Sequence, residues 1–322
     1  MSKNALAYLF NACHILPVLT LKIKPTIITL MDFKATIKDY RDRVEQALND
    51  LTPPAATRPA VLHEAMRYSL QAGGKRLRPC LILAAYELFP SDNDPLPACV
   101  AMECLHTYSL IHDDLPCMDD SDLRRGNPTC HKQFDDETAL LAGDALLTYA
   151  LWILADKYRY DPALAVDLVH DLGDAAGSEK LIGGQMEDLL GERDEPTAER
   201  LEFIHLNKTG ALMTTSLTMG YRLTGASAEN VAIMREAGRH LGLAFQIIDD
   251  ILDATSDAET MGKPVGADEE NNKMTYPSLY GLEASRAKAK EHTDEAIKGF
   301  EQLGGNNTVL IELARYMEQR VH

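Results

Sequence analysis

Apolar residues recur at intervals of three or four along most of the chain, a spacing typical of amphipathic α-helices. Within residues 32–51 the spacing is followed by Ile37, Tyr40, Val44 and Leu48. It predicts further helices over residues 57–74, 79–88, 96–113, 137–158, 163–172, 178–190, 197–223, 230–254, 276–303 and 308–320. Strand-like alternation of apolar and polar residues is nearly absent. We therefore predict an all-α protein.

Glycine and proline mark the ends of these predicted helices. Gly73 and Gly74 end the second helix, and Pro116 ends the helix over residues 96–113, because proline cannot continue a helix interior. No Pro/Ser-rich linker and no block of charge divides the chain, and no repeat of fixed period is evident. We expect a single-domain bundle of about ten or more helices over residues 31–322.

Composition and charge narrow the class of protein. Apolar residues make up 45% of the chain and charged residues 25%, which is ordinary for a globular protein. A net charge of -17 argues against nucleic-acid binding, so an anionic ligand must be met by local clusters of Lys and Arg. The six cysteines form no C-x-x-C pair, which suggests neither a zinc site nor disulfides. Reduced thiols and a cytoplasmic location are expected.

Residues 1–30 differ from the rest of the chain. They contain three lysines and no acidic residue, and two prolines interrupt their apolar runs. No apolar run there approaches the roughly 18 residues of a membrane span, and a transit peptide would be richer in arginine. We expect a leader or upstream extension, a folded protein beginning at Met31, and no stable membrane insertion.

The stretch HDDLPCMDDSDLRRG, residues 112–126, carries five aspartates followed by two arginines. Neighbouring carboxylates repel by about 1 to 4 kcal/mol at contact distance, so a solvated acidic loop and a cation site are the two interpretations. The preceding run CVAMECLHTYSLI is apolar enough for a core helix, which favours the cation site. Mg²⁺ typically takes one or two carboxylates together with substrate phosphates. Spacing alone leaves open whether Asp113 pairs with Asp119 across a turn or with Asp120 along a straight helix.

A second acidic segment, AFQIIDDILDAT, lies at residues 244–255. Asp249 and Asp253 are four residues apart on one face of a predicted helix, and Gln246 precedes Asp249 by three on the same face. Their apolar neighbours predict burial, where unpaired carboxylates are costly. Two inward-facing acidic clusters on separate helices indicate a pocket with metal ions on opposite walls.

The basic counterpart is GGKRLRP, residues 73–79. Lys75 and Arg78 lie three residues apart where a helix should begin, and the glycines let backbone amides approach an anion. An exposed basic turn is the alternative, but phosphate binding is favoured in an acidic protein with predicted diphosphates. His106 lies two helical turns before Asp113 on the same face, which distinguishes it from an ordinary core histidine.

Seven sequence blocks occur in a fixed order from about Met31 to the C-terminus: GGKRLRP, HTYSLIHDDLPCMDDSDLRRG, LLAGDALL, GGQMEDL, NKTGAL, FQIIDDILD and GKPVGADEENNKMTYPSLYG. On these blocks the chain resembles the trans-isoprenyl diphosphate synthases, most closely the bacterial farnesyl type. The resemblance implies the isoprenoid synthase fold, in which helices surround a central cavity. It also implies condensation of isopentenyl diphosphate with dimethylallyl and geranyl diphosphate, and a homodimer.

The resemblance implies four sets of site residues. Two magnesium ions would be carried by Asp113 and Asp119, and a third by Asp249 with support from Asp253, with Mn²⁺ as a substitute. The diphosphate of isopentenyl diphosphate would be bound by Lys75, Arg78, His106 and Arg125. The allylic substrate would be bound by Arg124, Lys208, Thr209, Gln246 and Lys263. Supporting roles would fall to Asp144, Gln185 and Asp188.

Tyr108 bears on the length of the product. It lies five residues before Asp113, about one helical turn deeper, where a growing chain would descend. In the resembling enzymes an aromatic residue at this place limits the product to fifteen carbons, which predicts farnesyl diphosphate. The alternatives are a geranylgeranyl diphosphate synthase, a terpene cyclase and a non-catalytic subunit of a heteromeric synthase. A cyclase has no need for the second cationic pocket, and a silent subunit would be expected to lack one acidic cluster.

Overall fold

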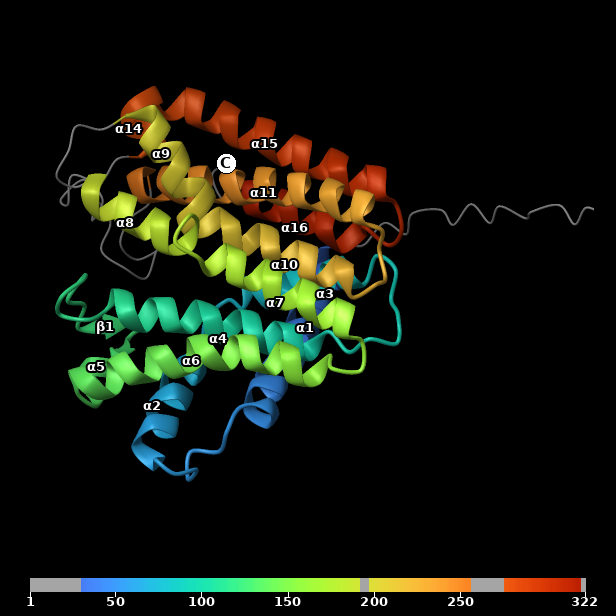
Figure 1. The fold of residues 1–322 in the computed structure, drawn as a ribbon. Coiled ribbons are helices and arrows are strands. Elements are labelled where there is room, and N and C mark those ends of the chain that lie inside the picture. The colour runs from blue at the N-terminus through green and yellow to red at the C-terminus, as the bar shows by residue number, and fades with distance from the viewer. Residues whose placement is uncertain (1–29, 192–196, 256–274, 320–322) are drawn as a thin grey trace, which may run out of the picture.

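The computed structural model describes residues 30–191, 197–255 and 275–319 (Figure 1). Lys263 and residues 1–29 of the predicted leader lie outside these ranges. In chain order the elements are α1 (Leu30–Leu51), α2 (Ala60–Gln71), α3 (Leu77–Tyr86), α4 (Leu96–Asp113), β1 (Leu123–Arg124), β2 (Asn127–Pro128), α5 (Cys130–Gln133), α6 (Asp136–Lys157), α7 (Pro162–Ala176), α8 (Leu181–Gly191), α9 (Ala198–Ile204), the π-helix η1 (His205–Gly210), α10 (Ala211–Arg222), α11 (Ala228–Thr255), α14 (Tyr276–Tyr280), α15 (Leu282–Leu303) and α16 (Thr308–Glu318).

The predicted all-α fold is confirmed, and several helix boundaries have clear physical causes. α6 begins where the Asp135 side chain accepts a hydrogen bond from the amide of Thr138 (2.6 Å), an N-cap that satisfies one free amide. α7 begins with Pro162 after the capping residue Asp161. α4 ends at Asp113, before Pro116 can interrupt it.

Three segments differ from the predicted helices. The helix predicted over residues 197–223 is divided into α9, η1 and α10, which follow one another without a break. The helix predicted over residues 276–303 is interrupted at Gly281 (φ 79°), so α14 and α15 are separate. The hairpin β1–β2 was not predicted, because strands of two residues are too short to show an alternating pattern.

The core lies among the long helices that cross the bundle. Figure 1 shows α4, α6, α10, α11 and α15 running across the molecule, and contacts join α4 to α6, α10 to α3 and α11, and α11 to α15. α10 is buried at every position from Ala211 to Tyr221, and α4 from Pro97 to Leu105. One hydrophobic cluster includes residues from Phe33 to Met317. The assignment of residues 31–322 to one domain stays a prediction.

Within the described residues, α6 alone is long and apolar enough to cross a membrane. Length and composition are weak support for a span, because a buried core helix meets the same criteria. Less than half of its most apolar stretch is buried. The absence of stable membrane insertion stays a prediction.

The hairpin, α8 and α14 lie at one end of the bundle (Figure 1). α4 ends at this same end, because Asp114, the residue that follows it, is bonded to Arg124 of the hairpin. The packing of the long helices therefore carries the first acidic stretch to a rim made of short elements and turns. Most of the predicted site residues lie on these elements or on the helices next to them.

Candidate active site

α4 ends at the first aspartate of the acidic stretch, and the chain then turns back on itself. The amide of Asp119 donates to the carbonyl oxygen of Asp113 (2.9 Å), and the amide of Met118 donates to that of Leu115 (2.9 Å). Asp120, the other partner that spacing allowed, follows in a left-handed conformation (φ 45°). The turn therefore brings Asp119 next to Asp113 along the backbone.

The other three aspartates of the stretch have basic partners. Asp114 is buried and accepts hydrogen bonds from Arg124, from Nε to Oδ2 (3.0 Å) and from Nη2 to Oδ1 (2.5 Å). Asp120 and Asp122 lie 3.8 and 2.9 Å from Nζ of Lys132. Basic side chains thus offset the negative charge of three of the five carboxylates.

The carboxyl group of Asp113 lies in a strongly perturbed environment. Burial raises its pKa to about 6, the ammonium of Lys208 opposes this rise, and the negative charge of Asp119 adds to it. A cation held by Asp113 and Asp119 would remove their mutual repulsion. The electrostatics of this corner therefore favour a bound cation.

The hairpin β1–β2 sends two consecutive arginines to different partners. Arg124 is paired with Asp114, as described above. Arg125 and Gly126 form the turn with positive φ angles (54° and 81°), the geometry of a tight hairpin. Nη1 of Arg125 donates to the carbonyl oxygen of Gly73 in the basic loop. The hairpin therefore connects the acidic stretch to the loop that carries Lys75.

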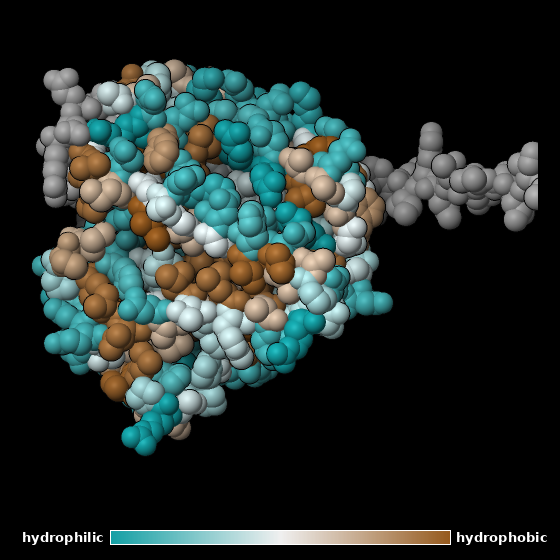
Figure 2. Space-filling view, in the orientation of Figure 1, coloured by the Kyte–Doolittle hydropathy of each residue, from teal (hydrophilic) through white to brown (hydrophobic). Residues whose placement is uncertain are grey.

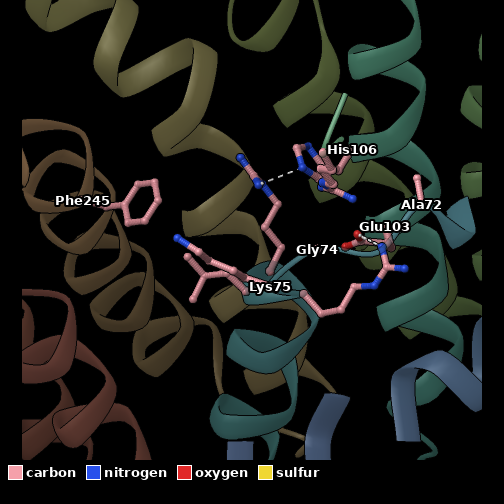
Figure 3. A pocket seen from close by; sticks show the side chains of 10 residues that line it. Ala72, Gly74, Lys75, Glu103, His106 and Phe245 are labelled. Carbon is pink, nitrogen blue, oxygen red and sulfur yellow. Dashed lines mark hydrogen bonds and ion pairs between the residues drawn. The ribbon is translucent and has the colours of Figure 1, made fainter. Parts of the chain in front are cut away.

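The basic loop opens onto a cavity of about 490 Å³ (Figure 3). Its ionisable lining consists of Lys75, Arg76, Arg78, Glu103, His106 and Arg125. Figure 3 shows His106 and Glu103 on one side of this cavity and the ring of Phe245 on the other, with Lys75 between them. Four cationic side chains against one carboxylate suit a polyanion such as a diphosphate, because charge-assisted hydrogen bonds are the strong ones.

Arg78 and His106 are joined across this cavity. Nη1 of Arg78 donates to Nε2 of His106 (3.4 Å), the dashed line in Figure 3. Burial and the neighbouring arginines lower the pKa of His106 well below its usual value, so the ring is neutral and can accept this hydrogen bond. Burial also lowers the pKa of Arg78, while Glu103 and Asp249 oppose this change. The carboxylate of Asp249, on the second acidic helix, therefore stabilises the charged form of Arg78.

A second cavity, of about 380 Å³, adjoins the first, because Arg78 and His106 line both. Asp113, Lys208 and Tyr108 are also part of its lining. The remainder includes apolar side chains: Leu110, Met118, Leu147, Leu181, Ile182 and Leu212. Charged groups and an apolar surface in one cavity suit a ligand with an anionic head and a hydrocarbon chain.

Lys208 and Thr209 lie in the π-helix η1, a rare element that is frequent at functional sites. Nζ of Lys208 forms an ion pair with Oδ2 of Asp188 in α8 (2.5 Å). α8 can come this close because residue 184 is glycine: a Cβ there would lie 2.4 Å from the backbone nitrogen of Lys208. Gly184 in the GGQMEDL block therefore permits the packing that presents Lys208.

The π-helix is also connected to the second acidic helix. The ring of His205 stacks on Tyr276 (5.4 Å between centroids, 16° between planes), and its Nε2 lies 3.4 Å from Oδ2 of Asp250. Asp250 also accepts a hydrogen bond from the amide of Tyr276 (2.9 Å). Burial lowers the pKa of His205 to about 4. This contact joins η1, α11 and α14 beside the acidic segment.

The second acidic segment lies on the uninterrupted helix α11. Asp253 is buried, whereas Asp249 and Gln246 are half-buried. The charge of Asp249 favours the charged form of Arg78. An electrostatic link thus runs from α11 to a residue that lines both cavities.

The residues present fit a hard divalent cation, although they do not enclose one. Among the described residues, no three carboxylate, histidine or cysteine side chains are grouped closely enough to hold a metal ion. Mg²⁺ commonly takes only one or two carboxylates and completes its shell with phosphate oxygens and water. Oxygen donors at Asp113 and Asp119, and the repulsion between them, suit that mode of binding.

Sequence reasoning missed several residues at this site. Arg76, Glu103 and His205 are buried and charged or polar, and they hold the loop and helices that carry the predicted groups. Arg76 lies within GGKRLRP, but nothing in the spacing distinguishes it from Arg78. Among the supporting residues, Gln185 lines the second cavity, and Asp144 is exposed, 3.8 Å from His112. Lys263 lies outside the described residues.

The fold and site define a class: all-helical proteins with a cationic cavity beside one that combines acidic and apolar walls. The chain has 44% identity over 267 residues to a farnesyl diphosphate synthase of Geobacillus stearothermophilus, covering 82% of this chain and 90% of the relative. It has 43% identity over 299 residues to the large subunit 1 of a chloroplastic heterodimeric geranylgeranyl pyrophosphate synthase of Arabidopsis thaliana, covering 90% and 80%.

Two solved structures are also similar. An FPP/GFPP synthase from Zymomonas mobilis has a TM-score of 0.80 at 36% identity, covering 90% of this chain and 100% of that one. A geranyltransferase from Helicobacter pylori, complexed with magnesium and isoprenyl diphosphate, has a TM-score of 0.76 at 32% identity, covering 89% and 96%. The model of the polyprenyl synthetase family matches residues 59–310. The chain belongs to this family, as the sequence blocks predicted.

Proposed function

We propose that the chain is a magnesium-dependent farnesyl diphosphate synthase. It would join isopentenyl diphosphate head to tail, in a 1'-4 condensation, first to dimethylallyl and then to geranyl diphosphate, and release diphosphate. The observation that carries this proposal is the pair of adjoining cavities that share Arg78 and His106. One cavity is cationic, and the other combines Asp113 and Lys208 with an apolar lining.

The cationic cavity would bind isopentenyl diphosphate. Lys75, Arg78 and Arg125 would donate to its diphosphate, and the guanidinium groups suit bidentate contact with phosphate oxygens. His106, neutral and bonded to Arg78, would orient that guanidinium. Because the cavity adjoins the second one, the double bond of the bound substrate would lie beside the allylic carbon.

The second cavity would bind the allylic diphosphate. Asp113 and Asp119 would hold two magnesium ions, and Asp249, supported by Asp253, a third, with Mn²⁺ as a substitute. When bound, magnesium supplies positive charge that stabilises the departing diphosphate. Arg124, fixed by Asp114, and Lys208, fixed by Asp188, would add preorganised cationic donors to the same leaving group.

Three further side chains, those of Thr209, Gln246 and Lys263, would complete the allylic site. Thr209 lines the second cavity beside Lys208, and Gln246 lies on α11 one turn before Asp249, so both would face the allylic end of the substrate. Lys263 keeps its predicted role next to the metal-bound diphosphate. The apolar lining would exclude water from the allylic cation, and the released diphosphate would accept the proton.

Tyr108 supports the fifteen-carbon product. Its ring is 5% exposed, lines the second cavity with Asp113, and meets the ring of His112 edge-on (5.6 Å, 89°). A ring held in this way would block a longer hydrocarbon chain. The alternative is a geranylgeranyl product, because relatives of both product lengths match the chain at similar identity.

A product assay tests the proposal. The purified chain is incubated with magnesium, dimethylallyl diphosphate and labelled isopentenyl diphosphate, and the products are separated by chromatography. We expect the wild type to yield farnesyl diphosphate and Tyr108→Ala to shift the product to twenty carbons or more. Tyr160→Ala, which changes an exposed tyrosine, is the matched control and should leave product length unchanged.

Each other outcome has a defined meaning. A twenty-carbon product from the wild type would replace the farnesyl assignment with a geranylgeranyl one. No turnover by the chain alone would favour the non-catalytic subunit of a heteromeric synthase. An unchanged product from Tyr108→Ala would remove the argument from the ring.

An exposed apolar surface supports the proposed homodimer. Figure 2 shows apolar side chains gathered across the middle of the face that Figure 1 presents. On α6 the exposed ones are Leu140, Leu141 and Trp152, with exposed fractions of 46, 56 and 52%. Leu141 and Trp152 are three helical turns apart and so lie on one face. Such a surface is typical of a site of protein contact.

The remaining expectations are also part of this proposal. Residues 31–322 would form one catalytic domain, and residues 1–30 a leader or upstream extension. The chain would act in the cytoplasm, with no nucleic acid as partner. The basis for the single domain is the absence of a linker in the sequence, and the basis for the other points is composition and charge.

A further inference from the structure

Arg76 stands between Lys75 and Arg78 in the basic loop, but its environment differs from theirs. Its guanidinium is fully buried, with an exposed fraction of 0%. Its backbone is left-handed (φ 50°, ψ 35°) and precedes the first residue of α3. This conformation is unfavourable for a residue with a side chain, so other contacts must hold it.

Hydrogen bonds from the guanidinium supply those contacts. Nε donates to Oε1 of Glu45 in α1 (2.7 Å), Nη1 to Oε1 of Glu103 in α4 (2.6 Å), and Nη2 to the carbonyl oxygen of Leu70 in α2 (2.6 Å). One side chain therefore connects the basic loop to three helices. The left-handed turn at Arg76 is kept in place by these bonds, and with it the positions of Lys75 and Arg78.

Glu103, which pairs with Arg76, is also part of the cationic cavity. Its side chain is 2% exposed, and it lines the same cavity as Lys75, Arg78 and Arg125 (Figure 3). The carboxylate of Glu103 also favours the charged form of Arg78. An uncompensated carboxylate at this place would, however, repel the diphosphate that the cationic side chains attract.

We propose that Arg76 is a positioning residue for isopentenyl diphosphate: it neutralises Glu103 and fixes the basic loop, without touching the substrate itself. This inference rests on the proposed function. It differs from a purely structural role in one respect. If Arg76 only held the fold, loss of either partner of the ion pair would weaken substrate binding. Because Arg76 also masks a negative charge, loss of Arg76 and loss of Glu103 should act in opposite directions.

The test compares Arg76→Met, Glu103→Gln and the double variant. The dissociation constant of isopentenyl diphosphate is measured by calorimetry on the full chain without magnesium, and its KM in the complete assay. We expect Arg76→Met to raise the dissociation constant about 10-fold or more, because it leaves a buried carboxylate in the cavity. Glu103→Gln should leave it unchanged or lower it. The double variant should bind isopentenyl diphosphate at least threefold more tightly than Arg76→Met, because no unpaired carboxylate remains in the cavity.

A matched control removes a similar ion pair away from the cavities. Arg222 on α10 pairs with the buried Asp171 of α7 (2.6 Å), so Arg222→Met should reduce thermal stability and leave the dissociation constant unchanged. The KM of the allylic substrate should change by less than about threefold in every variant, because Arg76 and Glu103 border only the first of the two cavities described above.

Two results would overturn the inference. One is a dissociation constant for Arg76→Met equal to that of the wild type. The other is weakening by Glu103→Gln with no recovery in the double variant. If Arg76→Met shows no thermal unfolding transition, it is not folded. The dissociation constants of Glu103→Gln and of the double variant then provide the test. If the wild type turns over both substrates and the variants give either of these results, this inference is contradicted and the proposed function stands. If the wild type is inactive, the proposed function is contradicted.

Discussion

The acidic and cationic sides of the candidate site are built in different ways. On the acidic side, Asp113 and Asp249 belong to the long regular helices α4 and α11. On the cationic side, Lys75 and Arg125 belong to loops, in which Arg76 and Arg125 have left-handed backbones. Asp113 and Asp249 are thus placed by helix register, whereas Lys75 and Arg125 are placed by individual hydrogen bonds such as those of Arg76 and Arg125.

This difference predicts how each side responds to change. Asp113 is destabilised as a carboxylate by burial and by Asp119, so the acidic side gives up stability in order to bind cations. The cationic side already contains its own acids, Glu103 and Asp114, which hold Arg76 and Arg124. Changes on the acidic side should therefore affect turnover and stability, and changes on the cationic side should affect substrate affinity.

The largest effect is expected from the acidic side. Asp113→Ala or Asp249→Ala should lower kcat about 1,000-fold, because each removes a proposed magnesium ligand and with it stabilisation of the leaving group. The measurement is steady-state turnover with saturating magnesium. Asp122→Ala is the control, since this exposed aspartate of the same stretch pairs only with Lys132 among the contacts described. A loss below tenfold for both site variants would contradict the assignment.

On the cationic side, Lys75→Ala should raise the KM of isopentenyl diphosphate by about 10- to 100-fold. This range corresponds to the loss of one hydrogen bond between charged groups. The KM of the allylic substrate should change little, because Lys75 is part of the first cavity and not of the second. Lys132→Ala is the matched control. Equal changes in both KM values would contradict the assignment of Lys75 to the cavity for isopentenyl diphosphate.

A smaller effect should come from the packing behind Lys208. Gly184→Ala places a methyl group 2.4 Å from the backbone nitrogen of Lys208, so η1 must shift. We expect kcat to fall about 10-fold, since small displacements of a positioned group reduce rate. Gly173→Ala, where a methyl group meets nothing within 4 Å, should have no such effect. Equal kcat values for the two variants would show that the position of Lys208 is not critical.

The smallest expected effect is a gain in stability. The pKa of Asp113 in the folded state, about 6, lies above its ordinary value of 3.8, so the folded state binds the proton more tightly. The stability from this group is present below about pH 4 and is lost as the pH rises through about 6. Asp113→Asn should therefore raise the melting temperature of the metal-free protein at pH 8 by about 2 to 5 °C.

Melting curves at pH 5 and pH 8 check this prediction. The difference between Asp113→Asn and the wild type should be larger at pH 8, where the wild-type carboxyl group is ionised. Asp122→Asn, at an exposed position, should show no difference between the two pH values. A lower melting temperature for Asp113→Asn at pH 8 would contradict the claim that this carboxylate is strained in the absence of metal.

The same comparison explains what the sequence could predict. Helical spacing located α4 and α11, and with them the acidic faces, because a helix places residues by a fixed period. It also located Lys75 and Arg78 at the start of a helix. Spacing alone could not choose between Asp119 and Asp120, because the turn after Asp113 depends on bonds across it.

Contacts between distant residues lay beyond the sequence pattern. The contacts of Arg76 with Glu103, and of Arg124 with Asp114, join residues 27 and 10 positions apart. The close approach of α8 to the π-helix at Lys208 depends on Gly184, which the sequence shows only as one of two adjacent glycines. These features arise from tertiary packing, which overrides local preference.

The most direct test of the account is a crystal structure of the protein with Mn²⁺ and a non-hydrolysable allylic diphosphate analogue. The anomalous signal of manganese locates the metal ions independently of the protein. We predict ions bound to Asp113 and Asp119 on one side and to Asp249 on the other, all in contact with a single diphosphate. Ions confined to one acidic helix, or a diphosphate bound away from both, would contradict it.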